Sequence, residues 1–254
     1  MADVVANGVR HHVQRLGAGA NKTVVFVHGL VMDNLSSFYF TLANPVAAHA
    51  EVILYDLRGH GLSDRPPRGY AVSDFVADLA ALLPDRPVHV VGNSFGGVVA
   101  LALAAAHPAR VASLALIDAH DGTAGWAAQM AATLALKGDA RDAKIAASFQ
   151  HWLGRHSEKK RTKLARHAEA LVEHTTLVAD LRGSPPLDEP ALRAVACPVL
   201  AIYGADSDVR ARGEALARIL PRCELAIVPG ATHSVLWEQT ALVRGRIVEW
   251  IACA

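Results

Sequence analysis

The chain has 254 residues, and its 25 Lys and Arg residues nearly balance its 24 Asp and Glu residues. Hydrophobic residues account for 52% and charged residues for 19%, which is typical of a packed globular protein and excludes a disordered chain. The balanced charge argues against a broad basic surface, so we expect no nucleic acid partner.

Cysteine usage and the lack of targeting segments predict a cytoplasmic protein. Cys197, Cys223 and Cys253 are scattered and lack CxxC spacing, which favours a reducing compartment over a disulfide framework or a zinc site. The first residues do not have the basic and then apolar pattern of a signal peptide. No apolar run approaches the roughly 20 residues that span a bilayer, so no membrane partner is expected. The sequence indicates no particular oligomeric state.

The first elements in chain order predict a β-hairpin followed by a parallel sheet. Asn7-Gly8 lies between Val-rich flanks and is typical of a two-residue hairpin turn. Short runs of Val, Ile and Leu without polar alternation then indicate strands buried on both faces. These runs are Thr23–His28, Glu51–Tyr55, Val88–Gly92, Ser113–Ile117, Val199–Tyr203 and Glu224–Val228. Helical stretches alternate with them at Val72–Leu83, Phe95–His107 and Gly213–Leu220, so the predicted class is α/β, with a mostly parallel central sheet flanked by helices.

One long segment interrupts this alternation. Between His120 and Glu189 no convincing strand appears, while Ala-rich stretches carry charges at helical spacing. We interpret residues 120–189 as an inserted helical cap of three or four helices, and residues 1–119 and 190–254 as the core. The expected cap helices are Trp126–Lys137, Ala140–Leu153 and Ser157–Leu181.

The strongest chemical motif is Gly92-Asn-Ser94-Phe-Gly-Gly97. It follows a predicted strand and precedes a predicted helix, which is the context of a G-x-S-x-G nucleophile turn. In such a turn the serine hydroxyl is exposed above a helix N-terminus, whose N–H groups stabilise developing negative charge. Ser94 is therefore the candidate nucleophile.

Two further motifs flank this serine in the chain. His28-Gly29-Leu30 lies at the end of the predicted strand Thr23–Val27, and the glycine allows a backbone N–H to turn toward the nucleophile. The backbone N–H groups of Leu30 and Phe95 are therefore the candidate oxyanion hole. His233 follows the last predicted strand, where catalytic groups of parallel sheets gather, and is the candidate base.

Together these segments resemble the α/β-hydrolase fold superfamily. The resemblance rests on Gly92–Gly97, His28-Gly29, Pro229–His233 and the loop Tyr55–Asp64, and it covers nearly the whole chain except the insertion. It implies a triad in the chain order Ser, acid, His, and a cap over the core. A serine nucleophile, where epoxide hydrolases and haloalkane dehalogenases carry aspartate, argues against those activities.

Three aspartates compete for the acid of the triad. The family's usual loop here reads Gly204-Ala-Asp206-Ser207-Asp208, and the common position of the acid, three residues after the glycine, is Ser207. Asp208 resembles a variant of this loop and is preferred over Asp206. Asp118, at the end of the strand Ser113–Ile117, is the main alternative because some relatives take their acid from that strand.

The predicted function is a cofactor-free serine hydrolase that acts on a small, largely apolar carboxylic ester, thioester or lactone through an acyl-enzyme. No Walker, Rossmann, HExxH or EF-hand pattern appears, so neither nucleotide nor metal is implied. One alternative is C–C bond cleavage in a β-diketone or ring-fission product, although Leu30–Asp33 replaces the glycine-rich loop usual in those relatives. The other is a ligand-binding protein or a biosynthetic lyase or cyclase of the same fold. The residues expected to line the pocket are Phe38, His120, Trp126 and Phe149.

Overall fold

An antiparallel hairpin leads into the sheet at the start of the chain. The computed structural model describes residues 2–17, 21–140, 143 and 158–253. Strands β1 (Ala2–Ala6) and β2 (Val9–Leu16) pair antiparallel, with Ala6 opposite Val9. Asn7 and Gly8 both have positive φ, at 49° and 75°, which is the geometry of a type I′ turn. The predicted hairpin is confirmed.

Eight strands in the described part of the chain form one sheet, in the order β1-β2-β4-β3-β5-β6-β7-β8. Strand β2 pairs antiparallel with β4, and the pairs from β4 to β8 are parallel, which confirms the predicted mostly parallel sheet. The parallel strands are β3 (Thr23–Val27), β4 (Glu51–Tyr55), β5 (Val88–Asn93), β6 (Val111–Ile117), β7 (Val199–Gly204) and β8 (Cys223–Val228).

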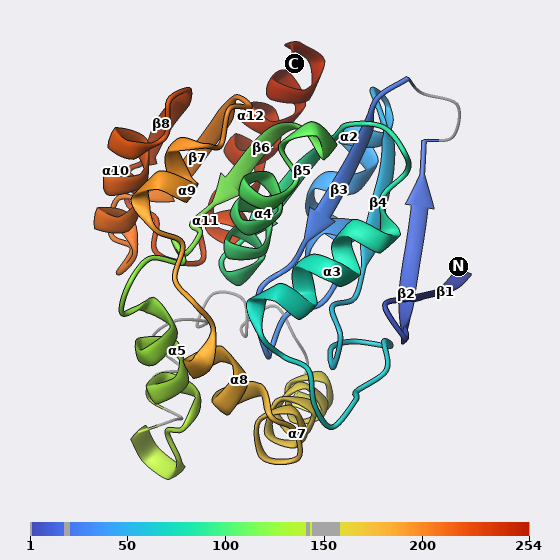
Figure 1. The fold of residues 1–254 in the computed structure, drawn as a ribbon, viewed down its shortest axis with the longest axis vertical. Helices are drawn as coiled ribbons and strands as arrows, with labels where there is room; N and C mark the ends of the chain where they lie inside the picture. Colours follow the sequence, from blue (N-terminus) through green and yellow to red (C-terminus); the bar gives the residue numbers. More distant parts are fainter. Residues whose placement is uncertain (1, 18–20, 141–142, 144–157, 254) are drawn as a thin grey trace.

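Helices pack on both faces of this sheet (Figure 1). One apolar core lies under α3 (Val72–Leu82), α4 (Phe95–Ala106), α9 (Glu189–Arg193) and α10 (Arg210–Ile219). The opposite core lies under two segments that the sequence reasoning did not identify as helical. These segments are the run α1 (Ser36–Phe38), η1 (Tyr39–Ala43) and α2 (Asn44–Ala47), and the pair α11 (Val235–Glu238) and α12 (Thr240–Cys253). A single 3₁₀ turn, η2 (Pro108–Arg110), precedes β6.

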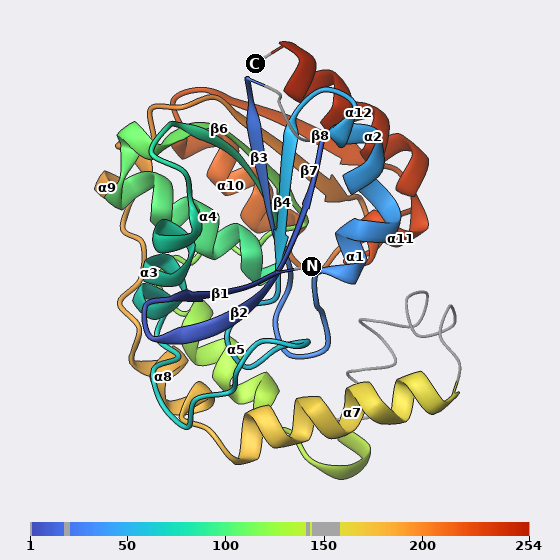
Figure 2. The ribbon, with the colours of Figure 1, turned by 90° about the vertical axis from the view of Figure 1, so that its right-hand side faces the viewer.

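Between β6 and β7, the described residues form three further helices. They are α5 (Trp126–Leu134), α7 (Glu158–Glu173) and α8 (Leu177–Gly183), and both views place them together at one end of the sheet (Figures 1 and 2). The expected helix Ser157–Leu181 is divided at residues 174–176, and most of the expected helix Ala140–Leu153 lies outside the described residues. Among the described residues, every helix is too short or too polar to cross a lipid bilayer.

Candidate active site

The turn between β5 and α4 holds Ser94 in a strained conformation. Ser94 has φ 53° and ψ −117°, which an L-residue adopts only where its surroundings enforce it. Its N–H donates to the Ile117 carbonyl at 3.0 Å, and its carbonyl accepts from the Gly97 N–H at 3.1 Å. A Cβ on Gly96 would lie 2.0 Å from the Val27 carbonyl oxygen, so only glycine lets α4 approach β3 this closely.

His233 bridges Ser94 and a buried carboxylate. Its Nε2 lies 3.1 Å from Ser94 Oγ, and its Nδ1 lies 2.6 Å from Asp118 Oδ2. An ionised carboxylate only accepts hydrogen bonds, so Nδ1 carries the proton and Nε2 is left to accept from the serine hydroxyl. The Asp118 side chain is completely buried, whereas the His233 side chain is 15% exposed. Ser94, His233 and Asp118 thus form a continuous hydrogen-bonded chain.

The carboxylate at His233 differs from the one preferred on sequence grounds. Asp206 and Asp208 are both exposed, and Asp208 lies in the wall of the adjoining cavity. Asp118 follows β6 with φ 43°, and its Oδ1 accepts the Gly204 N–H at 2.8 Å. Ser207, which occupies the family's usual acid position, donates its hydroxyl to Asp118 Oδ2 at 2.5 Å. The last residue of β7 and the loop that follows it therefore donate hydrogen bonds to the Asp118 carboxylate. Both ring nitrogens of His233 are hydrogen-bonded, one to Ser94 and the other to Asp118.

The loop after β3 lies against Ser94. A Cβ built on Gly29 would be only 3.5 Å from Ser94 Cβ. The Gly29 N–H donates to Asp33 Oδ2 at 2.7 Å, and Leu30 lines the cavity next to Ser94. Within the described residues no hydrogen bond occupies the N–H of Leu30, and the N–H of Phe95 is at the first position of α4, where no intrahelical acceptor exists. The assignment of these two amides to an oxyanion hole stays a prediction.

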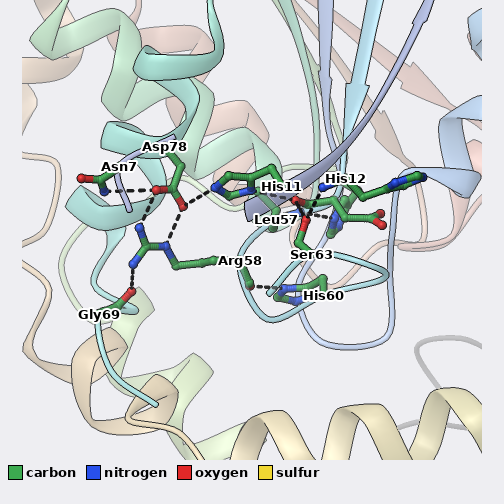
Figure 3. Close-up of polar contacts among 11 residues, drawn as sticks. Asn7, His11, His12, Leu57, Arg58, His60, Ser63, Gly69 and Asp78 are labelled. Atoms are coloured by element: carbon green, nitrogen blue, oxygen red, sulfur yellow. Dashed lines mark hydrogen bonds and ion pairs between the residues drawn. The ribbon is translucent and has the colours of Figure 1, made fainter. Parts of the chain in front are cut away.

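Two buried histidines hold this loop through their ring nitrogens. His60 Nε2 accepts the N–H of Val31 at 2.7 Å, and Val31 itself has φ 66°. His60 Nδ1 donates to the Arg58 carbonyl at 2.8 Å (Figure 3). Burial, with a smaller electrostatic contribution from His28, lowers the pKa of His60 from 6.5 to about 3, so the His60 ring stays neutral and can accept. His28 Nε2 accepts the Leu57 N–H at 2.9 Å, which agrees with a structural role for that histidine.

A buried ion pair supports the loop that carries His60. Arg58 Nε donates to Asp78 Oδ2 on α3 at 2.6 Å, and His11 Nε2 lies 3.5 Å from the same oxygen (Figure 3). Burial alone would raise the pKa of Asp78, but the nearby His11 ring and the hydrogen bonds from Arg58 outweigh burial and lower that pKa. The sequence reasoning did not anticipate the contact of His60 with Val31 or that of Asp78 with Arg58, because the two residues of each pair are 29 and 20 positions apart in the chain.

A cavity of about 350 Å³ opens beside Ser94 and His233. Its wall includes Trp126 and Met130 of α5 and Val172 of α7, together with His120. His120 and Trp126 thus lie where the sequence placed them. Phe38 instead packs under the opposite face of the sheet, and Phe149 lies outside the described residues. No group of three His, Cys, Asp or Glu side chains in the described part of the chain could hold a metal ion.

Burial is the main cause that keeps the imidazole of His120 neutral in this cavity. Its ring centroid lies 5.6 Å from that of His233. Burial, reinforced by His233 and Arg212, lowers the pKa of His120 from 6.5 to about 3, although Asp208 and Asp121 oppose the shift. At neutral pH the wall next to the nucleophile therefore presents an uncharged imidazole.

Comparison with known proteins identifies the family of this chain. The family described as alpha/beta hydrolase fold matches residues 22–219. A pimeloyl-[acyl-carrier protein] methyl ester esterase of Chromobacterium violaceum is 33% identical over 87% of this chain and 90% of its own. A putative 2-succinyl-6-hydroxy-2,4-cyclohexadiene-1-carboxylate synthase of Bacillus subtilis is 27% identical over 96% and 95%. The structure of a thermophilic esterase from Thermogutta terrifontis superposes with a TM-score of 0.80 at 21% identity, covering 98% of this chain and 97% of that one.

The chain therefore belongs to the alpha/beta hydrolase fold family and is a hydrolase.

Proposed function

We propose that this hydrolase cleaves a small ester, thioester or lactone through an acyl-enzyme on Ser94, with His233 as base and Asp118 as acid. The observation that carries the proposal is the hydrogen-bonded chain Ser94–His233–Asp118, in which Ser94 and His233 line the cavity. A serine hydroxyl is a weak nucleophile at neutral pH and needs a neighbouring base to remove its proton. Nε2 of His233, 3.1 Å from Ser94 Oγ, is positioned for this transfer.

In the first half-reaction Ser94 Oγ attacks the acyl carbonyl and His233 takes its proton. The resulting oxyanion accepts hydrogen bonds from the N–H groups of Leu30 and Phe95, each worth roughly 10²–10³ in turnover. Asp118 stabilises the imidazolium that forms while remaining ionised. His233 then donates its Nε2 proton to the leaving alcohol or thiol, which departs as the acyl-enzyme forms.

Deacylation requires a water molecule next to His233. A second hollow of about 40 Å³ borders Ser94 and His233 on the side of Asp33 and Asn93, and its volume exceeds that of one water molecule. A water there would lose its proton to His233 and attack the acyl carbon, which releases the acid and restores Ser94.

Helices α5 and α7 supply part of the cavity wall, which supports the proposal that residues 120–189 act as a cap over the core.

Labelling with a fluorophosphonate probe tests the nucleophile. We expect the wild-type protein to be labelled and to hydrolyse 4-nitrophenyl butyrate, and the Ser94→Ala variant to do neither while keeping its thermal transition. Persistent labelling of Ser94→Ala would refute the assignment. A panel with a thioester, a lactone and a β-diketone then identifies the bond, and selective turnover of the β-diketone would contradict the proposed ester class.

A further inference from the structure

A side-chain amide borders the hollow of about 40 Å³ next to the nucleophile. It belongs to Asn93, the last residue of β5, which borders this hollow but is absent from the wall of the larger cavity. A Cβ on Gly92 would meet the Gly96 carbonyl oxygen of α4 at 2.5 Å, so Gly92 faces α4 and the Asn93 side chain faces the opposite way. Leu236 of α11 packs on that opposite face and borders the same hollow. The Asn93 amide is therefore directed toward the hollow.

A neighbouring carboxylate fixes the orientation of this amide. Asp33 Oδ2 accepts hydrogen bonds from Asn93 Nδ2 at 3.4 Å and from the Gly29 N–H at 2.7 Å. Asp33 Oδ1 accepts the Asn34 N–H at 2.9 Å and the Ser37 hydroxyl. These four donors fill the lone-pair sites of the carboxylate, so Asp33 has no capacity for a further donor. Because a carboxylate only accepts, the amide nitrogen of Asn93 must face it, and the amide oxygen Oδ1 points elsewhere.

The amide oxygen of Asn93 has no donor among the described residues. No hydrogen bond to Oδ1 is made there, and the atom retains accessible surface although the residue is partly buried. Partly buried oxygens of this kind are normally hydrogen-bonded to protein or to ordered water. The hollow exceeds the volume that one water molecule needs. A water in the hollow thus has Oδ1 of Asn93 as an acceptor.

An acyl group on Ser94 gives such a water a second acceptor. Once Ser94 Oγ is acylated, its hydroxyl no longer donates to His233 Nε2, and a water can donate there instead. The other hydrogen of the water needs an acceptor of its own, and Asn93 borders the same hollow as Ser94 and His233. With both hydrogens engaged, the oxygen lone pairs remain for attack on the acyl carbon.

From these contacts we infer that Asn93 positions the hydrolytic water in the acyl-enzyme, while Asp33 holds its amide. The water gives one proton to His233 Nε2 and its oxygen bonds to the acyl carbon. The bond from that carbon to Ser94 Oγ then breaks, and His233 returns the proton to Oγ. The second hydrogen, bonded to Asn93 Oδ1, leaves with the acid. The inference rests on the proposed serine hydrolase function, and it assigns Asn93 to the second half-reaction, because attack by Ser94 requires no water.

A carbamoylating reagent separates the two half-reactions. 4-Nitrophenyl dimethylcarbamate transfers its carbamoyl group to the nucleophile and releases 4-nitrophenol, which reports the first half-reaction. After excess reagent is removed, recovery of 4-nitrophenyl butyrate hydrolysis, relative to the untreated protein, reports the attack of water. We expect Asn93→Ala to be carbamoylated within about threefold of the wild-type rate and to recover about tenfold more slowly, the effect of one lost hydrogen bond.

The variant Asn93→Leu removes the acceptor while it keeps the volume of the side chain. We expect it to recover as slowly as Asn93→Ala, because both variants lack Oδ1. Slow recovery of Asn93→Leu alone would indicate that bulk excludes the water, and it would overturn the inference. The control is Asn34→Ala, which removes another partly buried amide whose Oδ1 accepts the Ser36 N–H and which borders neither of these two cavities. It should recover at the wild-type rate, and thermal unfolding verifies that each variant folds.

The same measurements distinguish failure of this inference from failure of the proposed function. A wild-type protein that is neither carbamoylated nor active on 4-nitrophenyl butyrate would refute the function and the inference with it. Carbamoylation followed by equal recovery in the wild type and both Asn93 variants would overturn the inference alone. Equal slowing of carbamoylation and recovery would assign Asn93 a merely structural role, and it would also overturn the inference.

Discussion

Replacing Asp118 with asparagine tests which carboxylate completes the hydrogen-bonded chain that begins at Ser94. In the native arrangement Asp118 Oδ1 accepts the Gly204 N–H, while Oδ2 faces His233 Nδ1 and the Ser207 hydroxyl. In Asp118→Asn the side-chain oxygen must stay at the Gly204 N–H, because an NH₂ group there would face another donor. The NH₂ group then points at His233 Nδ1 and favours the tautomer whose Nε2 carries the proton. That tautomer cannot accept a proton from Ser94.

The expected loss in kcat is about 10³- to 10⁴-fold. At 1.36 kcal/mol per factor of ten, this loss corresponds to about 4–5.5 kcal/mol in the barrier. The assay is steady-state hydrolysis of 4-nitrophenyl butyrate together with the rate of fluorophosphonate labelling, and thermal unfolding verifies that the variant folds. The controls Asp208→Asn and Asp206→Asn change exposed carboxylates and should each lose less than about tenfold. The reasoning is refuted if Asp118→Asn stays within tenfold of wild type, or if Asp208→Asn loses as much as Asp118→Asn.

Two further predictions concern the framework of the site. Gly96→Ala should lower the free energy of unfolding by about 1–3 kcal/mol in urea melts, because its Cβ would meet the Val27 carbonyl oxygen at 2.0 Å. The matched change Gly245→Ala has open space around it and should be neutral or slightly stabilising; equal losses in both variants would contradict the packing argument. His60 has a folded-state pKa of about 3, below its ordinary 6.5, so its contribution to stability is present above pH 6.5 and is lost as the pH falls toward 3. Linkage predicts a loss of about 2 kcal/mol from this residue between pH 7 and pH 5, and urea melts of His60→Gln should show a correspondingly weaker pH dependence.

The features that local sequence determines were predictable. The hairpin at Asn7-Gly8, the buried strands and the Gly92–Gly97 turn each depend on the conformational preferences of a few adjacent residues. Strand β4, for example, has the predicted bounds Glu51–Tyr55. Helices α1 and α2, with three and four residues, are too short for a helical periodicity to show in the sequence. Helix α12 was also missed, although all three cover one face of the sheet.

The choice among the three aspartates depends on tertiary geometry. Strands β6 and β7 are neighbours, so the loops after them end at the same edge of the sheet, and spacing alone places all three carboxylates near His233. What separates them is burial and orientation, since Asp118 is buried and hydrogen-bonded from the β7 loop, whereas Asp206 and Asp208 are exposed. Ser207 was a usable signal, because a hydroxyl at the usual acid position can donate to a carboxylate supplied from elsewhere.

Three residues around the candidate active site have strained backbone conformations. Val31, Ser94 and Asp118 all have positive φ although none is glycine, and each such residue costs of order 1–3 kcal/mol. Hydrogen bonds from distant segments compensate for this cost: His60 accepts the Val31 N–H, the Ile117 carbonyl accepts the Ser94 N–H, and the Ile202 carbonyl accepts the Asp118 N–H.

The acceptor of the Val31 N–H is a ring nitrogen of His60, whereas the other two acceptors are backbone carbonyls. Protonation can abolish the ring nitrogen as an acceptor, but it leaves the carbonyls unchanged. A doubly protonated His60 has no lone pair for the Val31 N–H, so strong acid removes the contact that holds the residue next to Leu30. If Leu30 donates to the oxyanion as proposed, its amide would then lose the alignment that this role requires. Burial keeps the pKa of His60 at about 3, so its ring nitrogen remains an acceptor for the Val31 N–H at neutral pH.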